Sequence, residues 1–344
     1  MPGTRDIRRL ATILMGFLLA GCAGSPSTLL PASTNARVIT NLMWFFFGIA
    51  TFTFVIVEGL LIYAALKYRQ KGTPDLRKEG LPEQNEGNRS LEIAWTVAPA
   101  VVLAFIFIIS VVALRAVVSQ PDLTLNIAGD PSAINVRVIG HQWWWEFQYS
   151  DLKIVTANEY HVPVNTVVNL TVESGDVIHS YWAPQLGGKI DVIPGHPNHT
   201  WFNVTETGLF IGECAEYCGT QHAKMRFKVE AETAEQFQAW VKQQQSPPVE
   251  MTGDAAKGEQ VFMSGACGTC HAVQDTKAKG VIGPNLTHFA SRRTFAGSIL
   301  DISPQNLSAW LANPENLKPG TKMPNLGLTP EKISALVSYL ENLK

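Results

Sequence analysis

Two long apolar segments constrain the fold more than any other feature of this 344-residue chain. They run from about residue 41 to 66 and from about residue 93 to 118, and each is long enough to cross a bilayer as a helix. The first contains one charged residue, Glu58. Because lipid cannot satisfy unpaired backbone groups, both segments are predicted to be membrane-spanning helices.

The loop between these segments, residues 67–92, is basic, and it contains Lys67, Arg69, Lys71, Arg77, Lys78 and Arg89. The positive-inside rule keeps such a loop in the cytoplasm, so both outer ends of the hairpin 41–118 are predicted to lie outside.

The N-terminus carries a short targeting signal. Three arginines precede a short apolar run that ends in Leu18-Leu19-Ala20-Gly21-Cys22. This pattern resembles a bacterial lipoprotein signal and predicts removal of residues 1–21, lipidation of Cys22 and an external segment 22–40. An uncleaved first membrane helix is the alternative, although its apolar centre is too short to span a bilayer.

Residues 121–242 have the texture of a β-sandwich or barrel. Short runs rich in Val, Ile and Thr alternate with polar residues at 134–139, 166–172 and 225–229, separated by turn residues. Thr233 and Gln236 predict a capping box that starts a short helix, with Phe237 and Trp240 facing inward.

The copper loop, residues 214–225, places soft ligands close together: Cys214, Cys218, His222 and Met225. One Cys, two His and a weak Met make a mononuclear copper site, so a second Cys suggests two coppers that share the sulfurs. His179 is the best candidate for the missing imidazole. A Cys2His2 zinc site is the alternative that the same ligands could build.

A polar, proline-bearing linker, residues 243–253, leads to a helical region at 254–344. There Cys267-Gly-Thr-Cys270-His271 has the spacing of covalent c-type haem attachment, with His271 as an axial iron ligand. A redox dithiol is the alternative, but the following His and the lack of a βαβ pattern oppose it.

Met323 is predicted to be the sixth iron ligand, because it lies between the haem motif and the last helix. Met263 is too close to Cys267, and His288 is a competing ligand that is otherwise expected to be solvated. Pro284 is placed to offer its carbonyl to His271, a contact that orients a ligating ring.

The last region should form helices that start at Ser303-Pro304 and Thr329-Pro330, since each pair combines an N-cap residue with proline at the first helical position. In the final helix one stripe is predicted to be buried, made of Ile333, Leu336, Val337 and Leu340. These residues describe a small all-α domain.

The whole chain resembles subunit II of haem-copper cytochrome c oxidases, in the caa3 variety that carries a fused C-terminal cytochrome c domain. The resemblance rests on the hairpin, the copper loop and three further motifs: Gly140-His-Gln-Trp-Trp-Trp-Glu-Phe147, His179-Ser-Tyr-Trp182 and Asp191-Val-Ile-Pro-Gly195. It implies a transmembrane hairpin, an all-β cupredoxin domain at 121–242 and an all-α class I cytochrome c domain at 254–344.

The resemblance also implies a dinuclear CuA centre, with the backbone carbonyl of Glu216 among its ligands. The side-chain ligands it implies are His179, Cys214, Cys218, His222 and Met225. By the same resemblance the Glu216 side chain faces a magnesium or manganese ion shared with subunit I, and Asp191 lies near that interface.

The resemblance also implies roles for two further residues, Trp143 and Glu92. Trp143 matches the electron-input residue, whereas three successive tryptophans could otherwise anchor at a membrane interface or fill the core. Glu92 matches the residue at the mouth of a proton channel in subunit I, whereas a juxtamembrane glutamate is otherwise merely solvated.

The sequence thus predicts the electron-input subunit of a proton-translocating terminal oxidase in a bacterial inner membrane, with its metal domains outside. Expected partners are subunits I and III, a cytochrome c donor and membrane lipid; a net charge of −2 gives no reason to expect nucleic acid. The rival functions are a tethered electron carrier, a copper-delivery or zinc protein, and nitrous oxide reductase. A tethered electron carrier would have no use for Glu92. A copper-delivery or zinc protein would have no use for the haem domain, and nitrous oxide reductase would require a propeller domain that is absent from this sequence.

Overall fold

The computed structural model describes residues 26–69, 87–119 and 133–344. The chain divides into two compact units, one of residues 37–125 and one of the remainder. The expected signal peptide, its cleavage site at Cys22 and most of the basic loop lie outside the described residues.

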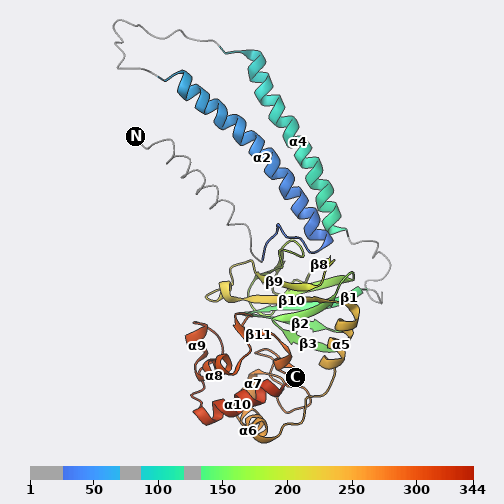
Figure 1. Ribbon diagram of the computed structural model, residues 1–344, viewed down its shortest axis with the longest axis vertical. Coiled ribbons are helices and arrows are strands. Elements are labelled where there is room, and N and C mark those ends of the chain that lie inside the picture. Colours follow the sequence, from blue (N-terminus) through green and yellow to red (C-terminus); the bar gives the residue numbers. More distant parts are fainter. Residues whose placement is uncertain (1–25, 70–86, 120–132) are drawn as a thin grey trace, which may run out of the picture. The chain divides into compact units, whose positions relative to one another are not determined.

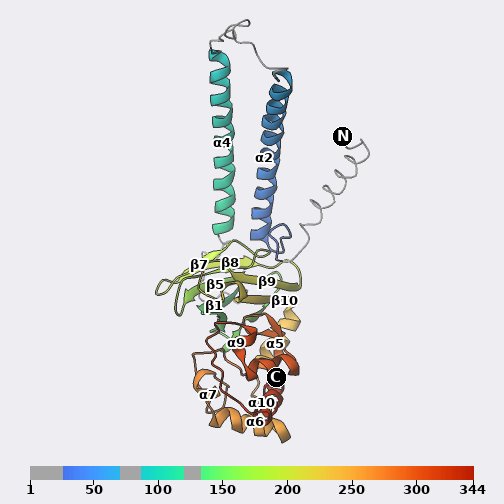
Figure 2. The same ribbon diagram turned by 90° about the vertical axis from the view of Figure 1, so that its left-hand side faces the viewer.

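The first unit is a helical hairpin of α2 (Thr34–Lys67) and α4 (Arg89–Val118), which run side by side (Figures 1 and 2). Both helices are long and apolar enough to span a membrane. The ring centroids of Phe45 and Phe105 lie 6.0 Å apart and join the two helices. Both helices begin before the apolar segments that were predicted to span the membrane, at residues 41 and 93. Helix α4 begins after Asn88, whose side chain accepts backbone N–H groups of its first turn.

A two-layer β-sandwich begins the second unit (Figure 1), which confirms the expected all-β domain. The strand order in one sheet is β3 (Ile154–Ala157), β2 (Trp144–Tyr149), β1 (Ala133–His141), β5 (Val167–Ser174) and β8 (Asn198–Asn203). The strand order in the other is β4 (Glu159–Pro163), β10 (Arg226–Glu232), β9 (Gly208–Cys214), β6 (His179–Trp182) and β7 (Ile190–Val192).

Alternation along the strands creates the core between the sheets. In β5, Val168, Leu170 and Val172 are buried while their neighbours are partly exposed. Aromatic side chains fill the centre, where the rings of Phe147 and Tyr160 stack with centroids 4.2 Å apart. The core therefore fixes both sheets rigidly around the copper loop, which begins at the end of β9.

Helix α5 (Ala234–Gln244) closes one edge of the sandwich. The Thr233 capping box is present as expected, and Phe237 and Trp240 are both buried. The Trp240 ring stacks on His161 with centroids 4.5 Å apart.

The C-terminal domain is helical, as expected. Its elements are α6 (Gly253–Ser264), α7 (Cys267–Cys270), η3 (Phe289–Ser291), β11 (Thr294–Phe295), β12 (Leu300–Asp301), α8 (Pro304–Ala312), α9 (Pro314–Leu317) and α10 (Pro330–Asn342). The Ser303 and Thr329 side chains cap α8 and α10. Helices α6 and α10 cross at Gly258, where a Cβ would lie only 2.0 Å from the carbonyl oxygen of Ala335, so only glycine permits this approach.

Candidate metal centres

The sandwich brings the predicted copper ligands together from two adjacent strands. Cys214 is the last residue of β9, and β6, which begins at His179, pairs with β9. The copper loop then returns through a short 3-10 helix, η2 (His222–Lys224), to Met225 just before β10. His179, both cysteines and Met225 are buried, whereas His222 is half-buried.

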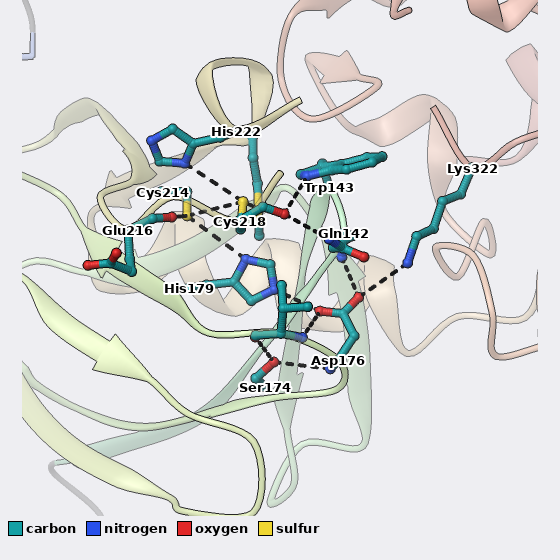
Figure 3. Close-up of polar contacts among 12 residues, drawn as sticks. Gln142, Trp143, Ser174, Asp176, His179, Cys214, Glu216, Cys218, His222 and Lys322 are labelled. Atoms are coloured by element: carbon teal, nitrogen blue, oxygen red, sulfur yellow. Dashed lines mark hydrogen bonds and ion pairs between the residues drawn. The ribbon is translucent and has the colours of Figure 1, made fainter. Parts of the chain in front are cut away.

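Four of the predicted ligand side chains, those of His179, Cys214, Cys218 and His222, lie close together (Figure 3), and Met225 contacts the same group. The Sγ atoms of Cys214 and Cys218 are 3.7 Å apart. His179 Nδ1 lies 3.9 Å from the Cys214 Sγ, while His222 Nδ1 and Met225 Sδ lie 3.7 Å and 3.8 Å from the Cys218 Sγ. The thiols are too far apart for a disulfide, whose sulfurs are about 2.05 Å apart.

These spacings fit shared metal ions. Two ligand atoms bound to one tetrahedral metal lie roughly 3.6 Å apart, given bonds of about 2.0–2.3 Å. The backbone oxygen of Glu216 adds a sixth group, 3.2 Å from the Cys214 Sγ, while its side chain is exposed. Two sulfurs, two imidazoles, a thioether and a carbonyl are a donor set that suits copper.

The contact between the two thiols shifts their pKa values in opposite directions. A hydrogen bond from Cys218 lowers the pKa of Cys214 to about 3 despite its burial. The same contact, together with burial, raises the pKa of Cys218. One thiolate is therefore ready to bind metal at neutral pH, and binding would displace the remaining proton.

Asp176, which the sequence analysis missed, holds His179 in place. Its Oδ1 atom is 2.8 Å from His179 Nε2, leaving Nδ1 to face the sulfurs. Burial opposes ionisation of Asp176, but hydrogen bonds from His179 and from the backbone N–H groups of Gln142 and Val177 outweigh it and lower its pKa to about 2. An acidic residue three positions before a ligand histidine was the only available signal in the sequence.

Trp143 contacts the copper loop directly. Its indole Nε1 donates to the carbonyl oxygen of Cys218 at 3.0 Å, and Gln142 Nε2 donates to the same oxygen at 2.8 Å (Figure 3). The residue expected to receive electrons is thus one hydrogen bond from a predicted metal ligand.

A cavity of about 440 Å³ lies in the C-terminal domain, and its walls include Cys267, Cys270, His271 and Met323. The Nδ1 atom of His271 lies 2.8 Å from the carbonyl oxygen of Pro284, the contact that the sequence predicted. A ring held through Nδ1 leaves Nε2 for iron. Two thiols, an imidazole and a thioether around one cavity fit a covalently bound haem c.

Other cavity residues were missed. Trp310 Nε1 donates to Met323 Sδ at 3.0 Å and so fixes the thioether. Arg292 is a partly buried cation in the wall, and loss of solvent lowers its pKa to about 10 despite the nearby Glu159. A cation in such a wall suits a cofactor that bears carboxylates. His288 was expected to be solvated if it did not bind iron, and this expectation was wrong, since only 3% of the residue is exposed. It is not among the residues that line the cavity.

The β-sandwich supplies part of the cavity wall, through Gln142, Trp143, Trp144 and Asn158. The Trp143 side chain therefore lies between the haem-motif residues and Cys218.

Two further predicted residues have exposed side chains. Glu92 is exposed in the first turn of α4, and Asp191 is exposed on β7. Their expected roles concern other subunits and stay predictions.

Comparison with known proteins agrees with this arrangement. The family model described as "Cytochrome C oxidase subunit II, transmembrane domain" matches residues 29–113, "Cytochrome C oxidase subunit II, periplasmic domain" matches residues 152–232, and "Cytochrome c" matches residues 255–344. These domains imply CuA copper and haem c as cofactors.

Relatives match the chain over almost its full length. The "Cytochrome c oxidase subunit 2" of Alkalihalophilus pseudofirmus is 34% identical, over 98% of this chain and 97% of the relative. That of Bacillus subtilis is 35% identical, over 97% of each chain. The crystal structure of the periplasmic domain of subunit II of cytochrome oxidase from Bradyrhizobium japonicum is 35% identical over 32% of this chain and 92% of that one, with a TM-score of 0.32. The chain therefore belongs to the cytochrome c oxidase subunit II family, in the form that carries a C-terminal cytochrome c domain, and it is an electron-transfer subunit of a bacterial inner-membrane oxidoreductase.

Proposed function

We propose that this chain receives electrons from a cytochrome c at its haem domain and delivers them through its copper centre to subunit I, where oxygen is reduced. The observation that supports this route is the position of Trp143. Its side chain lines the cavity of the haem motif, and its indole donates to the carbonyl of Cys218. The step between the two centres is therefore internal to one chain.

The copper pair would be held by His179, Cys214, Cys218, His222, Met225 and the carbonyl of Glu216. When bound, it supplies a one-electron redox couple. The protein contributes rigidity, because the ligands sit at the ends of strands whose core is closely packed. A scaffold that keeps its ligands fixed requires little rearrangement when the charge of the site changes.

The haem would be attached through Cys267 and Cys270, with His271 and Met323 as axial ligands. The hydrogen bonds from His271 to the Pro284 carbonyl and from Trp310 to Met323 orient both ligands. A Met ligand raises the potential of a haem, as suits an acceptor from other cytochromes.

The remaining roles concern the oxidase assembly. We propose that the Glu216 side chain helps to bind magnesium or manganese at the contact with subunit I, and that Glu92 lies at the mouth of a proton channel of a proton-translocating enzyme. Glu216 is exposed within the copper loop, and Glu92 is exposed at the start of a membrane helix, so both are available to another subunit. Subunit III, membrane lipid and a lipid-modified Cys22 complete the proposed surroundings.

The test is the rate of electron transfer from haem to copper in the full chain, loaded with copper and haem and started by photoreduction of the haem. Trp143→Phe is expected to slow the transfer, because it removes the indole that bridges the cavity and the Cys218 carbonyl. The control is Trp201→Phe, a buried tryptophan of β8 that is not part of the cavity wall. Equal rates in both variants and the unaltered chain would contradict the route.

A further inference from the structure

One of the contacts between the haem domain and the copper domain is an unusual turn, which we call the docking turn: Ala296, Gly297 and Ser298. All three residues have positive φ, of 56°, 80° and 59°. The Gly297 carbonyl accepts the backbone N–H of Arg226 at 3.0 Å, and the Ser298 hydroxyl donates to the carbonyl of Asn158 at 2.9 Å. Such a conformation is costly for residues with a Cβ, so these interdomain contacts help to maintain it.

Lys318 lies behind this turn. It directly follows α9, and only 3% of it is exposed. Its Nζ donates to three carbonyl oxygens: Trp143 at 2.9 Å, Ala296 at 3.0 Å and Lys224 at 3.1 Å. The first and last of these belong to the copper domain, and Lys224 adjoins the predicted ligand Met225.

The three contacts match the protonated form of Lys318, whose pKa burial lowers to about 7. A lysine has three N–H donors, and each one is matched by a carbonyl from a different segment. Lys318 also lines the haem cavity, but none of its donors is left for a group inside it. Lys322, by contrast, is half exposed, with its Nζ 3.6 Å from Asp176 (Figure 3).

The surroundings of Gly297 show how closely the domains approach. A Cβ on Gly297 would lie 2.6 Å from the Lys224 carbonyl oxygen, 2.7 Å from Lys318 Nζ and 3.2 Å from the Trp143 carbonyl oxygen. Only glycine fits this position. A second contact joins the two domains: the guanidinium of Arg293 in the haem domain pairs with both carboxylate oxygens of Glu230 in the copper domain, at 2.8 Å and 3.0 Å.

We propose that Lys318 is a positioning residue for electron transfer: its buried ammonium fastens the haem domain to the backbone of Trp143 and of the copper loop, and so fixes the haem cavity against the Trp143 side chain. A buried charge is a poor way to stabilise an interface, because apolar residues of similar volume generally do as well or better. A buried ammonium does, however, specify one arrangement of the two domains, because its three donors can satisfy these three carbonyls only in that arrangement. This role rests on the proposed route from haem to copper.

The test uses Lys318→Met in the full chain carrying both cofactors, with Lys332→Met, an exposed position on α10, as the control. Pulsed electron paramagnetic resonance measures the haem-to-copper distance, and photoreduction measures the transfer rate. Loss of three hydrogen bonds, each worth roughly a factor of five, should lower the ratio of docked to undocked domains by about a hundredfold. We expect a broadened distance distribution and slower transfer, with both cofactor spectra and the haem potential unchanged.

The opposite results are equally specific. A shifted haem potential with an unchanged distance would mean that Lys318 serves the haem instead, and an unaltered rate and distance would exclude a positioning role; either overturns the proposal. If Lys318→Met does not fold, Gly297→Ala perturbs the same contact and is judged by the same two measurements. Failure of the proposed route itself would be recognised separately, because the unaltered chain would then show no transfer from haem to copper.

Discussion

Gly297→Ala should separate the haem domain from the copper domain, because the position combines a positive φ with no space for a side chain. The added Cβ would stand 2.6 Å from the Lys224 carbonyl oxygen. The turn must retreat by roughly 1 Å to restore an ordinary contact, which starts near 3.5 Å between heavy atoms. The rest of the haem domain, which includes Lys318, retreats with the turn. The hydrogen bond from Lys318 to the Trp143 carbonyl, now 2.9 Å, is then lengthened beyond its useful range.

The expected loss can be divided into two parts. A Cβ in the left-handed region costs about 1–2 kcal/mol. The hydrogen bonds of Lys318 contribute about 1 kcal/mol each. With the bond to the Trp143 carbonyl lost, docking of the haem domain should therefore weaken by about 2–3 kcal/mol in free energy.

Gly253→Ala is the matched control, since Gly253 has a φ of +59° but no atom within 4 Å of its added Cβ. It should lose only the conformational part and leave docking intact. Haem-to-copper transfer and the haem-to-copper distance are measured in both variants. If Gly297→Ala transfers electrons as fast as Gly253→Ala, the close approach does not hold the domains together, and the reasoning is refuted.

Three further outcomes are expected. Cys218→Ser should abolish the dicopper signal in electron paramagnetic resonance and leave haem attached, whereas Met323→Ala should spare the copper and shift the haem spectrum; equal loss of both centres in either variant would contradict separate sites. Asp176→Asn should lower copper affinity by about 10- to 100-fold, as measured by competition with a chelator, because His179 loses the partner that orients it; unchanged affinity would show that the pair is not needed. Burial disfavours the charged form of His161, but hydrogen bonds and charges of two glutamates outweigh burial and raise the pKa of His161 above 6.5. The stability that protonated His161 contributes is therefore complete below about pH 6.5, and it is lost as the pH rises through the higher pKa of the folded state. Denaturation of His161→Gln should therefore show a weaker fall in stability over that interval, and an identical pH profile would exclude this linkage.

Local rules were enough to predict much of the fold. The Thr233 capping box, the caps at Ser303 and Thr329 and the contact from His271 to Pro284 depend on residues close in sequence, and all are present. The sandwich strands were recognisable because alternation reports which face is buried. The first residues of the membrane helices could not be predicted from hydrophobicity, since their polar first turns lie outside the apolar runs.

The contacts between domains could not be predicted. Lys318 reads as an ordinary surface lysine after a short helix, and its burial depends on carbonyls 94 and 175 positions away. Asp176 is only three residues from His179, but its carboxylate also accepts the backbone N–H of Gln142, 34 positions away. Sequence spacing predicts which residues share an element, whereas these partners depend on how distant elements are packed.

The central claim is that one chain holds a dinuclear copper centre next to its own haem. Electron paramagnetic resonance on the oxidised full chain, reconstituted with copper and carrying its haem, tests it most directly. We expect a multi-line copper pattern from one electron shared by two metals, with faster copper relaxation caused by the nearby haem iron. A mononuclear copper pattern, or a copper-silent site that binds zinc in its place, would contradict the account.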